Sequence, residues 1–132
     1  MKLEQLKARV RSGAIDTILV ALVDPFGRLV GKRFRAQAFL DSVAKHGTHG
    51  CNYLLTVNME MDPLDGFKVA SWEAGFGDFL LRPDLNTLRV LPWQSGAALV
   101  FCDHVREDGK LVDEETEQSV KSAFNAFLAA LN

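Results

Sequence analysis

The sequence predicts a single small α+β domain in which a mixed sheet is flanked by helices. The chain has 132 residues, of which 48% are hydrophobic and 24% charged. This is the composition of an ordinary globular protein, and a chain of this length can form one core without disulfides. Short apolar segments broken by turn residues alternate with amphipathic segments at helical spacing. Because strands and helices of this kind bury their apolar sides together, they predict one shared core.

Composition also argues against several classes of partner. The 15 Lys and Arg residues are balanced by 17 Asp and Glu residues, for a net charge of -2, so we expect no nucleic-acid partner. No stretch approaches the ~20 consecutive apolar residues of a membrane span, and the N-terminus lacks the apolar region of a secretory signal. We therefore expect no membrane partner. With only Cys51 and Cys102, a cytoplasmic location is simpler than a disulfide framework.

The first 35 residues predict a helix followed by a hairpin. Residues 1–14 place three apolar side chains at helical spacing before a glycine, which is typical of a short N-terminal helix. Residues 17–24 are aliphatic almost throughout and favour a buried central strand. The turn sequence DPFG follows, and residues 28–35 then alternate in polarity like a second strand.

The rest of the chain predicts a second helix, several short strands and a last helix. Residues 36–46 carry an apolar helical face and end at Gly47. Strands are expected at 52–61, 78–82, 87–91 and 97–103. A hairpin, a helix across the sheet and further strands follow the order of a β-grasp. We therefore assign residues 15–110 to a β-grasp-like domain and residues 111–132 to a C-terminal amphipathic helix.

One candidate site consists of histidines and cysteines. His46, His49 and Cys51, with Cys102 and His104 further along, offer nitrogen and sulfur ligands of the kind that zinc prefers. Their spacing is looser than the paired motifs of structural zinc sites, and histidine in a glycine-containing loop is common without metal. A small metal-binding protein is therefore one open interpretation, although we expect no metal in this chain.

Carboxylates form the second candidate. The sequence has no GxSxG, GxGxxG or P-loop motif, so nucleophile and phosphate-binding signatures are missing. A loop-rich stretch that also contains Phe67 and Trp72 carries six acids: Glu60, Asp62, Asp65, Glu73, Asp78 and Asp84. An acid and an aromatic ring on one loop can close over a cationic or amine substrate. The alternative is a solvated acidic surface with the tryptophan packed on the sheet.

Several stretches of the sequence carry a family resemblance. DTILVALVDPFGRLVGKRFRAQAFL, HGTHGCNYLL, MEMDPLDGF and SWEAGFGDFLLRPDLNTLRVLPWQSGAALVFCD resemble the N-terminal β-grasp domain of the glutamine synthetase family. The likeness is closest to the divergent ligases that join glutamate to ammonia or other amines. It covers residues 15–110, and its most specific part is RPDLNTLRVLPW, from Arg82 to Trp93.

This resemblance implies a role for one loop. In the family, ATP and magnesium activate the glutamate carboxylate in a much larger C-terminal domain, and the small domain lies against the active site of a neighbouring subunit. An Asp-Gly-Ser-Ser loop there binds ammonium, and the resemblance matches its acid to Asp65. Phe67 and Lys68 stand in place of the two serines, a departure that fits either a different amine substrate or a degenerate loop. The resemblance also puts Trp72 and Glu73 on this substrate-side loop.

The catalytic elements of that family are not found in this sequence. A ligase must bind polyphosphate with metals and cations, and a small sheet domain cannot also contain that site. We therefore expect the chain to be inactive alone, to bind no cofactor itself, and to lend residues 65–77 to a catalytic domain or to a neighbouring copy in an oligomer. The alternative is a freestanding interaction or regulatory module that binds through a sheet edge or through its last helix.

Overall fold

The computed structural model describes residues 1–24, 26–66, 73, 75–106 and 109. Their helices and strands are α1 (Leu3–Arg11), β1 (Thr17–Val23), β2 (Leu29–Arg35), α2 (Ala36–Ala38), the π-helical η1 (Phe39–Val43), α3 (Ala44–His46), β3 (Thr48–Cys51), the 3-10 helix η2 (Asn52–Leu55), β4 (Asp78–Pro83), the 3-10 helix η3 (Leu85–Thr87), β5 (Arg89–Val90) and β6 (Ala97–Val105). They form one small α+β domain, as the sequence predicts.

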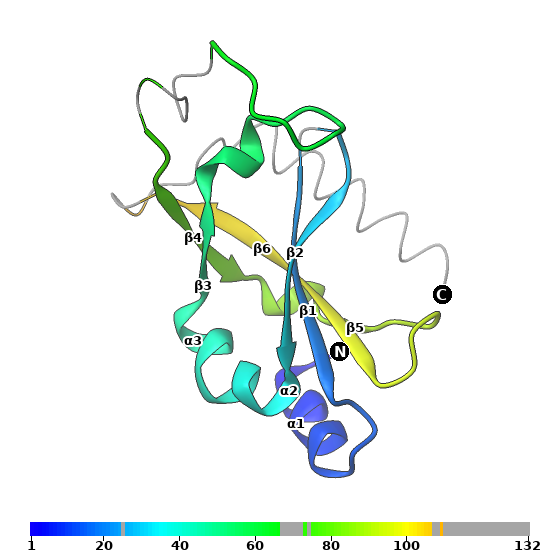
Figure 1. Ribbon diagram of the computed structural model, residues 1–132. Helices are drawn as coiled ribbons and strands as arrows, with labels where there is room; N and C mark the ends of the chain where they lie inside the picture. The colour runs from blue at the N-terminus through cyan, green and yellow to red at the C-terminus, as the bar shows by residue number, and fades with distance from the viewer. Residues whose placement is uncertain (25, 67–72, 74, 107–108, 110–132) are drawn as a thin grey trace.

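The described strands make one mixed sheet of six strands. Their order is β2-β1-β6-β4-β3, and β5 pairs with β6 beside this path. β1 and β6 run parallel, whereas the other neighbouring strands are antiparallel. In Figure 1, α1, α2 and α3 lie toward the lower end of the sheet. The turn between β1 and β2 lies toward its upper end, together with η2.

The aliphatic segment of the first hairpin is the buried central strand that the sequence predicts. β1 lies between β2 and β6, and Ile18, Val20 and Leu22 are 0–1% exposed. These side chains belong to the core that also contains residues of α1 and of the helix after the hairpin. Ala21 packs in a second cluster on the other face of the strand. Burial on both faces explains why this strand is apolar at nearly every position.

The helix after the hairpin is continuous, but its middle is wider than an α-helix. α2, η1 and α3 together span residues 36–46, the range that the sequence predicts. Phe39 and Val43 are buried on its inner face. The run ends where Gly47 adopts a φ of 73°, a left-handed conformation that glycine accepts without strain.

The expected strand at 52–61 is wrong. The strand at this edge is β3, which lies immediately before it and pairs with β4. Residues 52–55 turn into η2 because the Thr56 amide and hydroxyl both donate to the carbonyl oxygen of Tyr53. This side-chain bond stabilises a local turn at the expense of a strand ladder.

The segment 87–91 is also less extended than expected, because β5 has only two residues and follows η3. The Asp84 side chain caps η3 by accepting the Asn86 amide at 3.1 Å. Thr87 is 6% exposed; its hydroxyl donates to the Asp84 carbonyl at 2.7 Å and accepts the Phe101 amide at 2.9 Å. The most specific part of the family resemblance is therefore built around bonds that fix this turn against β6.

We expect Thr87→Val to lower the free energy of unfolding by about 1–3 kcal/mol. Valine keeps the shape of threonine but removes both buried hydrogen bonds of the hydroxyl. Urea unfolding of the two proteins measures this difference. Thr17→Val is the matched control, because the Thr17 hydroxyl bonds to the exposed Asp16 carboxylate. An equal effect of both changes would contradict this role of Thr87.

The predicted C-terminal helix at 111–132 lies outside the described residues. Among the residues that the structure does describe, no helix has the length and apolar character needed to cross a bilayer.

Candidate functional site

The segment before Asp65 is a closed loop with a narrow neck. The Leu64 amide donates to the Thr56 carbonyl at 2.7 Å, and Val57 and Pro63 form a β-bridge. Thr56 and Val57 are 1% and 2% exposed, so the neck is anchored in the protein interior. We call residues 56–64 the Asn58 loop. Asp65 leaves this loop directly at its neck, which fixes where the next segment begins.

Asn58 organises the interior of this loop. Its side-chain oxygen accepts the backbone amides of Glu60 and Asp62, both at 2.9 Å. The backbone amide of Asn58 donates to the backbone carbonyl of Asp62 at 2.9 Å. Met61 has a φ of 70°, the left-handed conformation that this tight turn requires. The loop is therefore held together mainly by bonds between near neighbours in sequence.

The C-terminal end of the predicted substrate-side loop, residues 65–77, is also attached near the neck of the Asn58 loop. The Asn52 amide donates to the Gly77 carbonyl at 2.9 Å, and the Gly77 amide donates to the Asn52 side-chain oxygen at 3.1 Å. The ring of Tyr53 meets that of Phe76 edge to face at a centroid distance of 6.3 Å. Residues 64 and 77 are thus both tied to the short segment 52–56.

An arginine joins this loop to the first hairpin. Asp24 is 1% exposed and its carboxylate accepts the Arg28 Nε at 2.6 Å, as well as the amides of Phe26 and Arg28. The two terminal nitrogens of Arg28 donate to the carbonyls of Met59, at 2.6 Å, and Asn58, at 3.0 Å. Figure 1 shows the hairpin turn and the Asn58 loop at the same end of the sheet.

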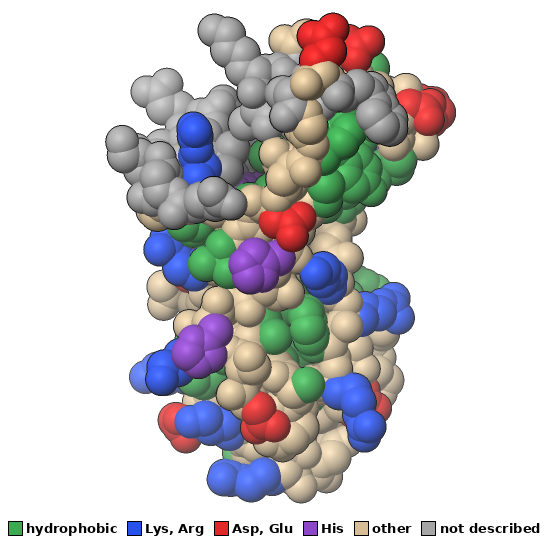
Figure 2. Space-filling model, turned by 60° about the vertical axis from the view of Figure 1, so that its left-hand side comes forward, with side chains coloured by type: hydrophobic (Ala, Val, Ile, Leu, Met, Phe, Trp, Pro, Cys, Tyr) green, Lys and Arg blue, Asp and Glu red, His purple; other side chains and the backbone are tan. Residues whose placement is uncertain are grey.

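This end of the molecule exposes apolar and acidic side chains together. The exposed apolar side chains are Phe26 (50%), Met59 (56%), Met61 (37%) and Leu64 (38%). The acids Glu60, Asp62 and Asp65 are exposed on the same stretch of chain. Figure 2 shows hydrophobic and acidic side chains side by side toward its upper end. Such a surface can bury apolar area against a partner and attract a cation at the same time.

The structure places the predicted site residues as follows. Asp65 is exposed immediately after the neck of the Asn58 loop, and Glu73 is exposed further along. Trp72 lies outside the described residues, as do Phe67 and Lys68. Of the six candidate acids, Asp84 is held apart from the loop because it caps η3.

Sequence reasoning missed the residues that hold this loop in place. Asp24 and Arg28 were assigned only to a turn and a strand, and Asn52 to a strand. Nothing in the spacing of Arg28 and Asn58 indicates that they meet, because they are 30 residues apart in the chain. The one available signal was the pair Asp24 and Arg28, which flank a Pro-Phe-Gly turn at a separation of four.

The structure places the histidine and cysteine candidates in different surroundings. Among the described residues, which include all five candidates, no three His, Cys, Asp or Glu side chains gather so that they could hold a metal ion. Cys102 and His104 are buried in β6, whereas His46 and His49 are exposed. The described residues therefore give no support to the interpretation as a small metal-binding protein.

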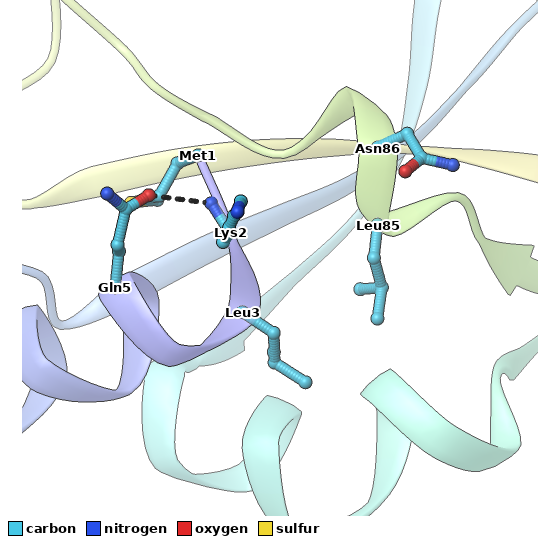
Figure 3. A pocket seen from close by; sticks show the side chains of 6 residues that line it. All are labelled: Met1, Lys2, Leu3, Gln5, Leu85 and Asn86. Atoms are coloured by element: carbon cyan, nitrogen blue, oxygen red, sulfur yellow. Dashed lines mark hydrogen bonds between the residues drawn. The ribbon is translucent and has the colours of Figure 1, made fainter.

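A hollow of about 440 Å³ lies away from the loop, between the start of α1 and η3 (Figure 3). Its lining residues are Met1, Lys2, Leu3, Gln5, Leu85 and Asn86. The Lys2 amide donates to the Gln5 side chain at 2.8 Å, and the terminal ammonium of Met1 donates to the Leu88 carbonyl at 2.6 Å. None of the candidate acids lines this hollow, so it adds nothing to the site at Asp65.

Three curated proteins give the sequence comparison. The chain is 51% identical over 109 residues to gamma-glutamylethanolamide synthetase GlnA4 of Streptomyces coelicolor, which is 83% of this chain and 24% of that enzyme. It is 38% identical over 104 residues to glutamate--isopropylamine ligase of a Pseudomonas species, covering 77% and 23%. It is 28% identical over 93 residues to type-1 glutamine synthetase 2 of Dictyostelium discoideum, covering 70% and 18%. The chain thus spans about a quarter or less of the length of these relatives.

Solved structures support the fold. Apo GmaS without ligand matches with a TM-score of 0.54 and 24% identity, over 76% of this chain and 20% of that one. A GmaS/ADP complex in conformation 1 matches with a TM-score of 0.52 and 23% identity, over 77% and 20%. No protein-family model matches the chain. At this identity the structural likeness concerns the fold alone.

Proposed function

Because this chain belongs to the glutamine synthetase family of ligases, we propose that it is the N-terminal β-grasp domain of a cytoplasmic glutamate-amine ligase. In this proposal, residues 65–77 form a substrate-side loop that completes the active site of a neighbouring catalytic domain. One observation carries the proposal: the exposed Asp65 is held at the neck of the Asn58 loop, beside exposed apolar side chains that a partner would cover.

The proposed chemistry assigns two tasks to Asp65. Primary amines are protonated at neutral pH, so a carboxylate attracts them to the site by charge. An amine must lose a proton before or while its nitrogen forms a bond to the activated glutamate carboxyl, and an adjacent carboxylate can accept that proton. The catalytic domain would hold the ATP and magnesium that activate the glutamate. This chain binds and deprotonates the amine.

We further propose that the amine carries a carbon substituent. The names of two relatives specify an ethanolamide product and isopropylamine. In this sequence Phe67 and Lys68 follow Asp65 and Gly66, and the exposed Met61 and Leu64 lie just before them in the chain. Apolar residues this close to Asp65 in the sequence favour an alkylamine over ammonia, because an alkyl group that packs against apolar side chains loses its contact with water.

The proposed partner is a catalytic domain, either in a longer form of the same chain or on a neighbouring subunit of an oligomer. Four exposed apolar side chains at one end of the molecule are a feature of interaction surfaces. The same feature would also suit the alternative, a regulatory module that binds a ligase without contributing to its chemistry. The two proposals differ in whether the loop itself affects turnover.

A hybrid enzyme tests the proposed function. We would replace the matched segment of the Streptomyces coelicolor relative with residues 15–110 of this chain and measure ATP-dependent coupling of glutamate to ethanolamine. We expect the hybrid to keep its kcat within about tenfold of the parent enzyme, because both segments would present the same loop. Deleting the segment should abolish coupling.

The purified chain alone is the control, and we expect it not to turn over ATP with glutamate and magnesium. A hybrid that folds and assembles like the parent but shows no coupling would favour the regulatory module. ATP turnover by the chain alone would contradict both proposals.

A further inference from the structure

Arg28 connects the end of β1 and the β1–β2 turn to the Asn58 loop. Its Nε pairs with the buried carboxylate of Asp24 at the end of β1, and its two terminal nitrogens reach the carbonyls of Asn58 and Met59. The guanidinium also lies over the ring of Phe26, 5.5 Å from its centroid. An arginine suits this position because its planar fork can donate in two directions at once, which a lysine ammonium does less well.

The Asp24–Arg28 pair differs from an ordinary surface ion pair. Exposed pairs contribute little because water competes for both partners. Here the Asp24 side chain is 1% exposed, and that of Arg28 is 25% exposed. The carboxylate also accepts two backbone amides of the hairpin turn, at 3.0 and 2.8 Å. The bond to the Asp24 carboxylate therefore orients the guanidinium so that its terminal nitrogens face the Asn58 loop.

The Asn58 loop keeps its own shape through local bonds, so Arg28 has a different task. The bonds from the Asn58 side chain span at most four residues and do not touch the hairpin. The Arg28 bonds join residues 30 and 31 positions apart. They hold the whole loop against the end of the hairpin, and Asp65 follows the neck of that loop.

We propose that Arg28 is a positioning residue for amine binding: it holds the Asn58 loop against the β1–β2 turn and thereby sets the place of Asp65. This inference rests on the proposed function of Asp65. Without the guanidinium the loop is held less firmly against the turn and opens more easily, and the carboxylate no longer stays where the amine binds. A displacement of about 1 Å at a reacting group can cost up to ~10²-fold in rate.

The test is Arg28→Met in the hybrid enzyme, with KM determined separately for ethanolamine, glutamate and ATP. We expect the KM for the amine to rise about tenfold, while those for glutamate and ATP stay within about twofold. A merely structural defect would instead reduce the amount of active enzyme, which lowers kcat and leaves every KM unchanged. Methionine retains an apolar stem of similar length, so packing is largely preserved.

Two further variants make the test specific. Arg28→Lys keeps the charge but cannot reproduce the fork, so we expect a smaller rise in the amine KM, about threefold. Arg33→Met changes an exposed arginine of β2, the strand that begins directly after Arg28, and should leave the amine KM within about twofold. If Arg28→Met does not fold, the outcome of Arg28→Lys decides: an unchanged amine KM would contradict the inference.

The failure of this inference and that of the proposed function give different results. If Asp65→Asn raises the amine KM but Arg28→Met behaves like Arg33→Met, Arg28 has no positioning role and the proposed function stands. If Asp65→Asn has no effect, both ideas are wrong.

Hydrogen exchange of the isolated chain gives a second readout. We expect Arg28→Met to speed exchange in peptides covering residues 56–64, with β1 and β6 unchanged.

Discussion

Asp65→Asn is expected to lower kcat/KM for the amine in the hybrid enzyme by about 10²-fold or more. Asparagine has nearly the size of aspartate, but it carries no charge to attract a protonated amine and cannot accept its proton. General-base groups typically contribute 10²–10⁴-fold to a rate, and the loss of charge attraction adds to this. Steady-state kinetics with ethanolamine as the varied substrate measures the effect.

Asp62→Asn is the matched control, because Asp62 is an exposed acid of the Asn58 loop and the resemblance assigns it no role. Its backbone groups, not its carboxylate, make the loop bonds with Asn58. We expect a change in kcat/KM of less than about threefold. Equal losses in the two variants would mean that the loop acts through its overall negative charge, and no loss in either would contradict the role of Asp65. Trp72→Ala and Glu73→Gln extend the same test along the loop.

Gly31→Ala is expected to have the largest effect on stability, a loss of about 3 kcal/mol in the free energy of unfolding. Gly31 pairs with Ala21 in the first hairpin. A Cβ atom at Gly31 would collide with the backbone oxygen of Val20 and would lie 2.8 Å from the Cα of Ala21. Both are backbone atoms of the central strand, so the hairpin must open to admit the methyl group, and overpacking of this kind costs about 1–3 kcal/mol or more.

Thermal unfolding of the chain measures this loss, and 3 kcal/mol corresponds to a decrease in Tm of about 10 °C at this chain length. Gly77→Ala is the control. The nearest atom to its Cβ would be the Asn52 side-chain nitrogen at 3.8 Å, which is ordinary contact. We expect Gly77→Ala to change the free energy of unfolding by no more than about 0.5 kcal/mol. A Tm for Gly31→Ala equal to that of Gly77→Ala would show that the two strands do not approach as closely as described.

The sequence predicted secondary structure correctly where the pattern of apolar residues lies within a single helix or strand. The aliphatic run of β1, the apolar face of residues 36–46 and Gly47 at its end each carry a period or a stop signal within a few residues. The β-grasp order followed from these elements. The expected strand at 52–61 failed because a threonine side chain bonds locally to the backbone, and hydrophobicity does not indicate which of two local conformations wins.

The sequence by itself determined the fold class, the central hairpin and the family resemblance that points to Asp65, because local spacing and short motifs carry that information. Only the tertiary structure decided what fixes the position of Asp65. The bonds from Arg28 to Asn58 and Met59, and from Asn52 to Gly77, join residues 25 to 31 positions apart. Such partners come together only when the hairpin, η2 and β4 pack in the folded sheet. Contacts between residues so far apart in the chain leave no periodic pattern in the sequence from which they could be predicted.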